Sequence, residues 1–555
     1  MGDEDDATRA GTAAGGSLTA VPSQPAGGRA RIDVVVLCAL SGLIIVLAAA
    51  RRDFLGDGVR QLPAVLSSHP TFGEPRWLLF PPLAWIWVRL LSVLGIVRGT
   101  EAALQAMLWM SVTSGIVFLW SIRSWLLVEC NDVTRRAAAL MLAGSCAPVL
   151  ILFSDVAEPQ MAAAVVACGL AYARRRRDEP ELGRRGALIA IGAITLAALI
   201  YQGAILALGM LPLVVASKAI GKRRVMVRAG ASVTVVFVAM VGAQIAGGTA
   251  PRLAVATALR GERNPQMRSL MARPSPSKYL VAIVAGSPQG LLALENFSGV
   301  PALLSSLGGG DRAASHAAIL NASRLLLGWA VLGIILINGV RTANWRVLAA
   351  LGVLLILPVL RNQQYGYSKF FILWPIPVAL LAIRCRPRSI ALAAAAVVLS
   401  NTWLVVHDIH RGRELYFAVK EQYGRATPST CWFTSGWSPP VSYLWPGTTV
   451  PVLGMLATGD DPTAQASALT TALRRCFCES DAVWTDSSSR DGEVLSSIAH
   501  HFDYTWIDLK AVLAEPSELA DLPVPAGHLY SKPAQERSCR FTSEVRPDRR
   551  RAPPR

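Results

Sequence analysis

Residues 51–101 decide how the chain is organised, and they read RRDFLGDGVRQLPAVLSSHPTFGEPRWLLFPPLAWIWVRLLSVLGIVRGTE. Two carboxylates, Asp53 and Asp57, follow the first apolar run of the sequence, and His69 and Glu74 precede an aromatic stretch that a Pro-Pro pair opens. By hydropathy alone, the aromatic stretch would be a second membrane span. Whether it crosses the membrane sets the direction of every later element.

The composition places the chain among helical membrane proteins. It has 555 residues, a net charge of +17 and a mean hydropathy of +0.41, with many long apolar runs. In lipid, backbone polar groups must be satisfied within the segment, so these runs are expected to be helices. Lys and Arg gather in short turns between the runs, which favours membrane orientation as the reason for the charge over nucleic-acid binding.

The basic turns test whether residues 77–97 cross the membrane. If they do, the clusters RRRRDEPELGRR (174–185), KAIGKRRVMVR (218–228) and RCRPR (384–388) all face outward. If residues 77–97 lie on the surface, all three clusters face the cytoplasm, together with the N-terminus, as the positive-inside rule expects. The sequence therefore predicts an α-helical polytopic membrane protein with about eleven transmembrane helices and a surface helix in the first external loop.

The expected spans follow from this reading. They are residues 34–50, 102–122, 137–153, 161–173, two short helices within 186–216 that meet at Tyr201-Gln202-Gly203, then 229–247, 317–337, 347–360, 370–383 and 389–406.

Three regions are expected in chain order. Residues 1–32, acidic and then rich in Gly, Ala, Ser and Pro, read as a disordered cytoplasmic leader. Residues 33–406 form the transmembrane domain, in which residues 248–316 make a long external loop with several arginines, read as solvated and mobile. Residues 407–555 lack long apolar runs and are expected to form a small external α/β domain with strands at 449–457, 482–484 and 504–507 and helices at 463–475 and 492–501.

The external domain contains Cys431, Cys476, Cys478 and Cys539, while the other cysteines lie in or beside the spans. Four cysteines in an oxidising compartment could form two disulfides, in any of three pairings. This agrees with an external placement of residues 407–555 without proving it.

Two short motifs resemble those of the GT-C glycosyltransferases. FPPLAW (80–85) is similar to the Pro-Pro-Leu helix that these enzymes lay on the membrane surface, and SDVAEPQ (154–160) is similar to their short, acidic second external loop. The family includes protein O-mannosyltransferases and lipid A aminoarabinose transferases. The resemblance implies a GT-C-like fold over about residues 33–406 and an enzyme that uses polyprenyl-phosphate-linked sugars.

The resemblance also implies a carboxylate in the first external loop as general base. The Asp-Glu pair frequent in the family is absent here, so either Asp57 or Asp53 could serve. We favour Asp57 because glycines on both sides allow a tight turn that brings its carboxylate toward a substrate. The alternatives are that Asp57 caps the following helix and that Asp53 pairs with Arg51 or Arg52.

Further candidates lie in the other external turns. Asp155 and Glu158 could hold the acceptor or a divalent metal such as Mg²⁺ or Mn²⁺, or be loop charges only. His69 could bind phosphate or substrate, although a single His before Pro is more often structural, and Glu74 in the same segment is a further substrate-binding candidate.

The loop RNQQYGYSK (361–369) offers Arg361 and Lys369 for the lipid phosphate and Tyr365 for the sugar or prenyl chain. Tyr, Lys and Arg also serve simply as interfacial anchors. Tyr201 and Gln202, at the break between the two short helices, could contact substrate or satisfy the broken backbone.

The sequence thus predicts a bacterial inner-membrane glycosyltransferase with a cytoplasmic N-terminus and a periplasmic C-terminal domain. It would transfer a sugar, with inversion, from a polyprenyl-phosphate donor to an envelope glycan or lipid acceptor, and it would not bind nucleic acid. Two alternatives stay open. An O-antigen polymerase or ligase would depend on the arginines of residues 248–316, and a lipid or sugar flippase would explain the broken helices, although we find no internal repeat.

Overall fold

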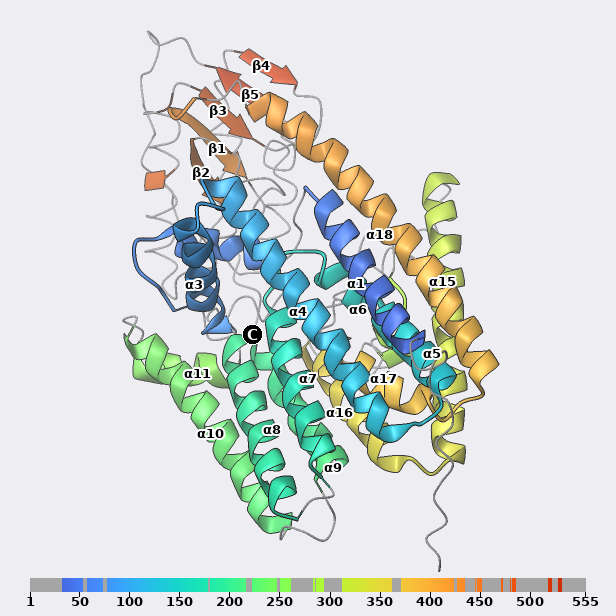
Figure 1. Cartoon of the computed structure of the whole chain (residues 1–555). Helices are drawn as coiled ribbons and strands as arrows, with labels where there is room; N and C mark the ends of the chain where they lie inside the picture. Colours follow the sequence, from blue (N-terminus) through green and yellow to red (C-terminus); the bar gives the residue numbers. More distant parts are fainter. Residues whose placement is uncertain are drawn as a thin grey trace, which may run out of the picture.

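The protein is a mostly helical, multi-pass integral membrane protein (Figure 1). Its structure is a computed structural model that describes residues 32–52, 57–72, 77–177, 180–215, 222–246, 250–260, 283–284, 286–293, 312–361, 371–423, 427–434, 445, 447–451, 471–472, 480, 482–485, 518–521 and 528–531. Within these residues, five helices are long and apolar enough to cross a membrane. They are α1 (Ile32–Ala50), α4 (Thr100–Glu129), α10 (Lys222–Ala246), α15 (Arg312–Arg341) and α18 (Pro387–Tyr423). The number of spans beyond these five stays a prediction.

The helix bundle has two polar ends, which we name by what lies there. At the leader end, where α1 begins, Asp33 pairs with Arg123 near the end of α4, at 3.1 Å between Oδ2 and Nε. The two helices are therefore antiparallel, and residues 51–99 leave and re-enter the bundle at the opposite end. We call that opposite end the domain end, because the β-sheet lies beyond it (Figure 1). This geometry is what a first loop without a membrane crossing requires.

The segment between α1 and α4 folds against the domain end. It contains the 3₁₀ helix η2 (Asp57–Gln61), α2 (Leu62–Leu66) and α3 (Phe80–Val93), which starts with prolines in its first turn, where their missing N–H groups cost nothing. The indole of Trp87 donates to the Ala106 carbonyl of α4 at 2.8 Å, and the guanidinium of Arg89 donates to the Ser67 carbonyl at 2.7 Å. These bonds fix α3 beside the start of α4.

The next hairpin returns to the leader end and carries an unpredicted break. α5 (Val133–Gly144) is capped by Asp132, whose side chain accepts from two backbone N–H groups. The chain then bends at Ser145 and Cys146 before α6 (Ala147–Leu152), and α7 (Pro159–Arg175) runs back. Arg174 at the end of α7 meets Glu129 of α4 at 2.6 Å, so both of these helices end at the leader end.

A second hairpin is broken where the sequence indicated. α8 (Pro180–Ile200) ends at Tyr201, and the chain continues as the 3₁₀ helix η4 (Gln202–Met210) and α9 (Leu211–Val214). The Leu79 N–H, just before α3, donates to the Leu199 carbonyl at 2.9 Å, which places the break at the domain end beside α3. After α10, the short helix α11 (Pro251–Arg260) follows.

Part of the long loop is buried inside the bundle. Residues 286–293, which include the 3₁₀ helix η5 (Ser287–Gly290), are buried, so the prediction of a solvated loop is wrong for this stretch. The fully buried Asn401 of α18 donates to the carbonyls of Ser145 and Leu291, each at 2.7 Å, and accepts from the Ala293 N–H at 2.9 Å. One side chain thus satisfies the irregular backbone of both the re-entrant stretch and the α5–α6 bend, as burial in a membrane domain requires.

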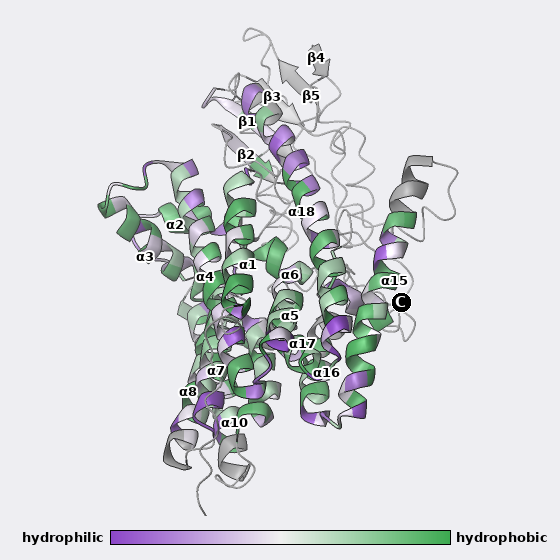
Figure 2. Ribbon diagram, turned by 45° about the vertical axis from the view of Figure 1, so that its right-hand side comes forward, coloured by the Kyte–Doolittle hydropathy of each residue, from purple (hydrophilic) through white to green (hydrophobic). Residues whose placement is uncertain are grey.

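The last helices lead to the sheet. α16 (Trp345–Arg361) is followed by α17 (Pro375–Ala382), which is buried throughout, and then by α18, which continues beyond the predicted boundary at residue 407. Figure 2 shows that the hydrophobic part of α18 gives way to a hydrophilic part toward the sheet.

The sheet is mixed and has five strands in the order β2-β1-β3-β5-β4. Its strands are β1 (Thr430–Thr434), β2 (Thr448–Pro451), β3 (Ala482–Thr485), β4 (Glu518–Asp521) and β5 (His528–Ser531). β1 pairs in parallel with β2 and β3, and β5 pairs antiparallel with β3 and β4.

β3 matches the predicted strand at 482–484, and β2 matches the start of the one predicted at 449–457. Residues 504–507 and the predicted helices at 463–475 and 492–501, apart from the helical residues 471–472, lie outside the described residues. Cys431 in β1 is disulfide-bonded, in line with the oxidising compartment that the sequence predicted for this domain. The described cysteines of the helical bundle are free thiols.

Candidate functional site

A buried ion pair marks the centre of the domain end. Arg51, the first residue after α1, and Asp155, in the turn between α6 and α7, lie with Nη1 and Oδ2 3.5 Å apart, and their side chains are only 5% and 3% exposed. The other oxygen of Asp155 accepts from the Val156 N–H at 2.7 Å. The α1 carbonyls at this end also favour a cation, since they form the negative pole of the helix dipole.

The Asp57–Gly58 turn packs directly on this acidic turn. A Cβ atom at Gly58 would lie 2.9 Å from the Val156 carbonyl oxygen, which is closer than real Cβ atoms approach. Glycine therefore lets the first loop touch the backbone of the turn that carries Asp155. Asp57, the neighbour of Gly58, opens η2 at this contact, although its side chain lies outside the described residues.

An apolar pocket adjoins the same turn. It lies where the start of α7, the break after α8, α16 and the segment before α17 meet. Its lining residues are Pro159, Ala162, Ala163, Tyr201, Gly203, Ala204, Leu206, Leu354, Ile372 and Leu373. The pocket is small, and it brings the predicted site residue Tyr201 next to the end of the Asp155 turn.

The acidic turn is itself held rigidly. Gln160 donates to the carbonyls of Leu152 at 2.6 Å and Asp155 at 3.3 Å, and every residue from 151 to 160 is buried. Glu158 is 1% exposed and sits directly before the pocket residue Pro159. The two carboxylates predicted from the sequence are thus buried groups at the domain end and not surface loop charges.

The other predicted site residues divide into two groups. His69 is exposed, and its ring Nδ1 lies 2.9 Å from the Ser68 hydroxyl, while Gln202 is half-buried at the start of η4. The side chains of Asp57 and Arg361 and the whole of Asp53, Glu74, Tyr365 and Lys369 lie outside the described residues. For these residues, a role at the site stays a prediction.

A metal at Asp155 and Glu158 has weak support in the geometry. Among the described residues, no group of three or more His, Cys, Asp or Glu side chains could hold an ion. The Asp155 carboxylate already faces the Arg51 guanidinium. A divalent ion there would be repelled by the guanidinium and would compete with it for the same oxygens.

Sequence reasoning missed Arg51 as a site residue. From the sequence, Arg51 is expected only as a partner for Asp53, whereas the structure places it against Asp155. A signal was present, since Arg51 lies at the expected outer end of the first apolar run, where the positive-inside rule does not favour a cation.

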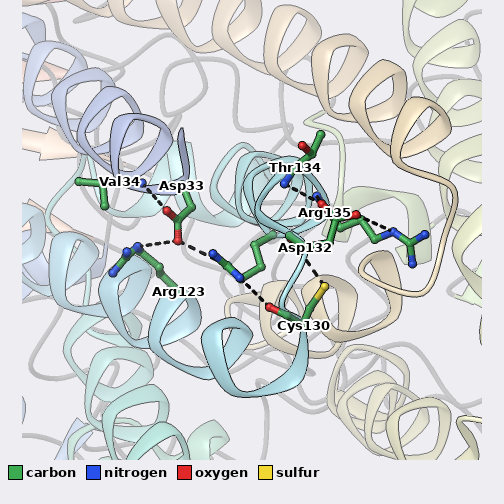
Figure 3. Close-up of polar contacts among 8 residues, drawn as sticks. Asp33, Val34, Arg123, Cys130, Asp132, Thr134 and Arg135 are labelled. Carbon is green, nitrogen blue, oxygen red and sulfur yellow. Dashed lines mark hydrogen bonds and ion pairs between the residues drawn. The ribbon is translucent and has the colours of Figure 1, made fainter. Parts of the chain in front are cut away.

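The leader end holds a second charged cluster, in which one aspartate is shared by two arginines. Asp33 is fully buried and pairs with Arg123 at 3.1 Å (Figure 3). It also pairs with Arg136 at 3.6 Å. The guanidinium of Arg136 also donates to the Cys130 carbonyl at 2.8 Å. Nearby, Glu129 accepts from Trp125 and Arg174.

No protein-family model and no curated protein matches the sequence. Solved structures of GT-C membrane glycosyltransferases are similar to the chain. ArnT from Cupriavidus metallidurans, in the apo state, has a TM-score of 0.44 at 15% identity and covers 90% of this chain and 98% of its own. The same protein bound to undecaprenyl phosphate gives 0.45 at 14%, covering 91% and 99%.

The archaeal oligosaccharyltransferase AglB from Archaeoglobus fulgidus, in complex with an inhibitory peptide and a dolichol-phosphate, gives 0.45 at 13%, covering 87% of this chain and 72% of its own. Structural similarity at such low sequence identity assigns no activity, so the function has to be argued from the chain's own residues.

Proposed function

We propose that this chain is an integral-membrane glycosyltransferase that moves a hexosyl or pentosyl group from a polyprenyl-phosphate donor to an envelope acceptor. The observation that carries the proposal is the contact of Gly58 with the Val156 backbone. Through this contact, a first-loop aspartate, a buried arginine and a buried acidic turn come together at one end of a membrane bundle. An inverting transfer from a lipid phosphate needs a base, a cation and a membrane boundary in one place.

In the proposed reaction, Asp57 accepts the proton of the acceptor hydroxyl, with Asp53 as the alternative base. The acceptor oxygen then attacks the anomeric carbon from the face opposite the phosphate. The bond from the anomeric carbon to the phosphate oxygen breaks, and the lipid phosphate leaves with the electron pair. The products are an inverted glycosidic bond and a free polyprenyl phosphate.

The apolar pocket and the surface helix suit a lipid-linked donor. The pocket beside Pro159 and Tyr201 offers an apolar surface for the first part of a prenyl chain. α3 places Trp85 and Arg89 together, with the guanidinium 5.4 Å from the indole centroid, and such pairs are common at membrane boundaries. The proposed orientation puts the domain end and the sheet on the periplasmic side of a bacterial inner membrane, since the basic turns lie at the leader end.

The base is tested by an envelope-glycan profile of a deletion strain complemented with Asp57→Asn, Asp53→Asn or wild-type protein. Loss of a general base lowers the rate by roughly 10²- to 10⁴-fold, so one of the two variants should fail to restore the wild-type profile. Asp132→Asn is the matched control, because this carboxylate caps α5 at the leader end. Full restoration by both first-loop variants at wild-type protein levels would remove the base from the proposal.

A further inference from the structure

Arg51 is a buried cation with unused hydrogen-bonding capacity. A guanidinium carries five N–H donors and stays charged in proteins. Among the described residues, the polar contact of this side chain is the single 3.5 Å approach of Nη1 to Asp155, and its buried Nε has no hydrogen-bond partner. Asp155, in contrast, also accepts a short bond from the Val156 N–H.

A buried guanidinium N–H without an acceptor destabilises the folded protein unless a ligand accepts the hydrogen bond. A buried N–H without an acceptor destabilises a protein by about 1–3 kcal/mol, and buried polar groups in native structures are nearly always paired. At the leader end, the buried Nε of Arg136 also lacks a hydrogen bond, but its Nη1 donates to the Cys130 carbonyl at 2.8 Å in addition to the ion pair with Asp33 at 3.6 Å. Arg51 lacks such a second partner among the described residues.

The chemistry of the missing partner follows from the donors. A guanidinium fork matches the oxygens of a phosphate, with two parallel N–H···O bonds. The position is at the polar end of a membrane bundle, near a small pocket lined mainly by apolar side chains. A phosphate attached to a long apolar chain fits both features.

We propose that Arg51 binds the phosphate of the lipid-linked donor and supplies there the positive charge that a divalent metal would otherwise provide. The inference rests on the proposed function and goes beyond it, since it names the phosphate-binding residue and makes the transfer independent of added metal. Asp155 is then a positioning residue that holds the guanidinium in place through its ion pair. As the donor bond breaks, charge grows on the leaving phosphate, and a fixed guanidinium stabilises it.

The test measures equilibrium binding of undecaprenyl phosphate to the full-length protein in nanodiscs. Arg51→Gln alone would leave Asp155 buried without its partner, so the decisive variant is Arg51→Gln/Asp155→Asn, which removes both charges. We expect this variant to bind undecaprenyl phosphate roughly 10- to 100-fold more weakly than wild type, the effect of one or two charge-assisted bonds. Arg51→Lys keeps the charge without the fork and should retain part of the affinity.

Arg52→Gln is the matched control. The neighbouring Arg52 is more exposed, and it donates to the carbonyls of Ala49 and Arg51. This variant should bind as wild type does. Wild-type binding should also be unchanged by EDTA, and neither inorganic phosphate nor phosphatidylglycerol should displace the ligand at equal concentration.

Four results would overturn the inference. They are wild-type affinity in the double variant, loss of binding on chelation with recovery in Mg²⁺ or Mn²⁺, displacement by phosphatidylglycerol, and displacement by inorganic phosphate. The outcomes that would refute the proposed general base differ from those that would refute the phosphate site. If the Arg51 variants bind normally while Asp57→Asn is inactive, the base stands and this inference falls. If the Arg51 variants lose binding while both first-loop aspartate variants transfer normally, the phosphate site stands and the base falls.

Discussion

The two ends of the helix bundle both bury arginines and aspartates, but they satisfy them differently. At the leader end, Asp33 lies between two guanidinium groups, and one of these, Arg136, has a backbone carbonyl as a further partner. At the domain end, Arg51 faces one carboxylate at 3.5 Å. Neither end is fully satisfied, since the Nε atoms of Arg123 and Arg136 and one oxygen of Asp33 also lack hydrogen bonds, but Arg51 has a single carboxylate as its polar partner among the described residues. We therefore propose a structural role for the leader end and a chemical role for the domain end.

The largest effect should come from breaking the leader-end cluster. Asp33→Ala leaves the buried Arg136 and the partly buried Arg123 near each other without their shared carboxylate. Breaking a buried pair in this way costs about 3–5 kcal/mol, so the variant should show a clearly lower thermal unfolding midpoint in detergent. Transfer per folded molecule should stay at the wild-type level. A variant that folds normally but no longer transfers sugar would place function at the leader end and break the comparison.

A smaller effect, on sugar transfer and not on stability, should follow from Gly58→Ala. The new methyl group would meet the Val156 carbonyl at 2.9 Å, so the first loop must move away from the Asp155 turn. We expect transfer to fall by about 10- to 100-fold because the base is displaced from the reacting hydroxyl, with little change in unfolding temperature.

Gly42→Ala in α1 is the matched control, since a Cβ there has no neighbour within 4 Å. The two variants differ only in whether the added methyl group reaches the acidic turn. Equal transfer by both would show that the Gly58 contact does not position the site.

The smallest effect concerns the surface pair that joins α4 to α18. Lys420 Nζ lies 2.8 Å from Glu101 Oε1, with the side chains 49% and 51% exposed. The hydrogen bond to Glu101, followed by one to Tyr416, raises the pKa of Lys420 above its ordinary value of 10.5. The stability from this pair is present below pH 10.5 and is lost as the pH rises through the higher pKa of the folded protein.

Glu101→Gln should therefore lower the free energy of unfolding by a few tenths of a kcal/mol at neutral pH. The difference from wild type should shrink in high salt and above pH 10.5. Urea unfolding in detergent at neutral and alkaline pH measures it. A difference that grows with pH would contradict the sign of the pKa shift.

The antiparallel course of α1 and α4 could be predicted from the sequence because it follows from many charges acting together. The basic turns at residues 174–185, 218–228 and 384–388 outweigh the apolar character of residues 77–97. The break at Tyr201 was also visible, since a run too long for one crossing and too short for two full ones has to bend there.

The buried contacts could not be predicted, because they join residues far apart in the sequence. Asn401 is a single polar residue in an apolar run, and nothing local tells that it satisfies Ser145 and Leu291. The pairing of Arg51 with Asp155 depends on where α1 and α6 end relative to one another, which only packing sets. The bend at Ser145 and Cys146 did have a local signal, since Gly144 and Pro148 flank it.

The most direct measurement compares matched neutralisations at the two ends in a deletion strain. Arg51→Gln/Asp155→Asn removes the domain-end pair, and Glu129→Gln/Arg174→Gln removes a leader-end pair held at 2.6 Å. The envelope-glycan profile is scored against the amount of folded protein. We predict that the domain-end variant accumulates as folded protein without restoring the glycan, while the leader-end variant restores it in proportion to its folded amount. Restoration by the domain-end variant, or failure by a well-folded leader-end variant, would contradict the assignment of the site.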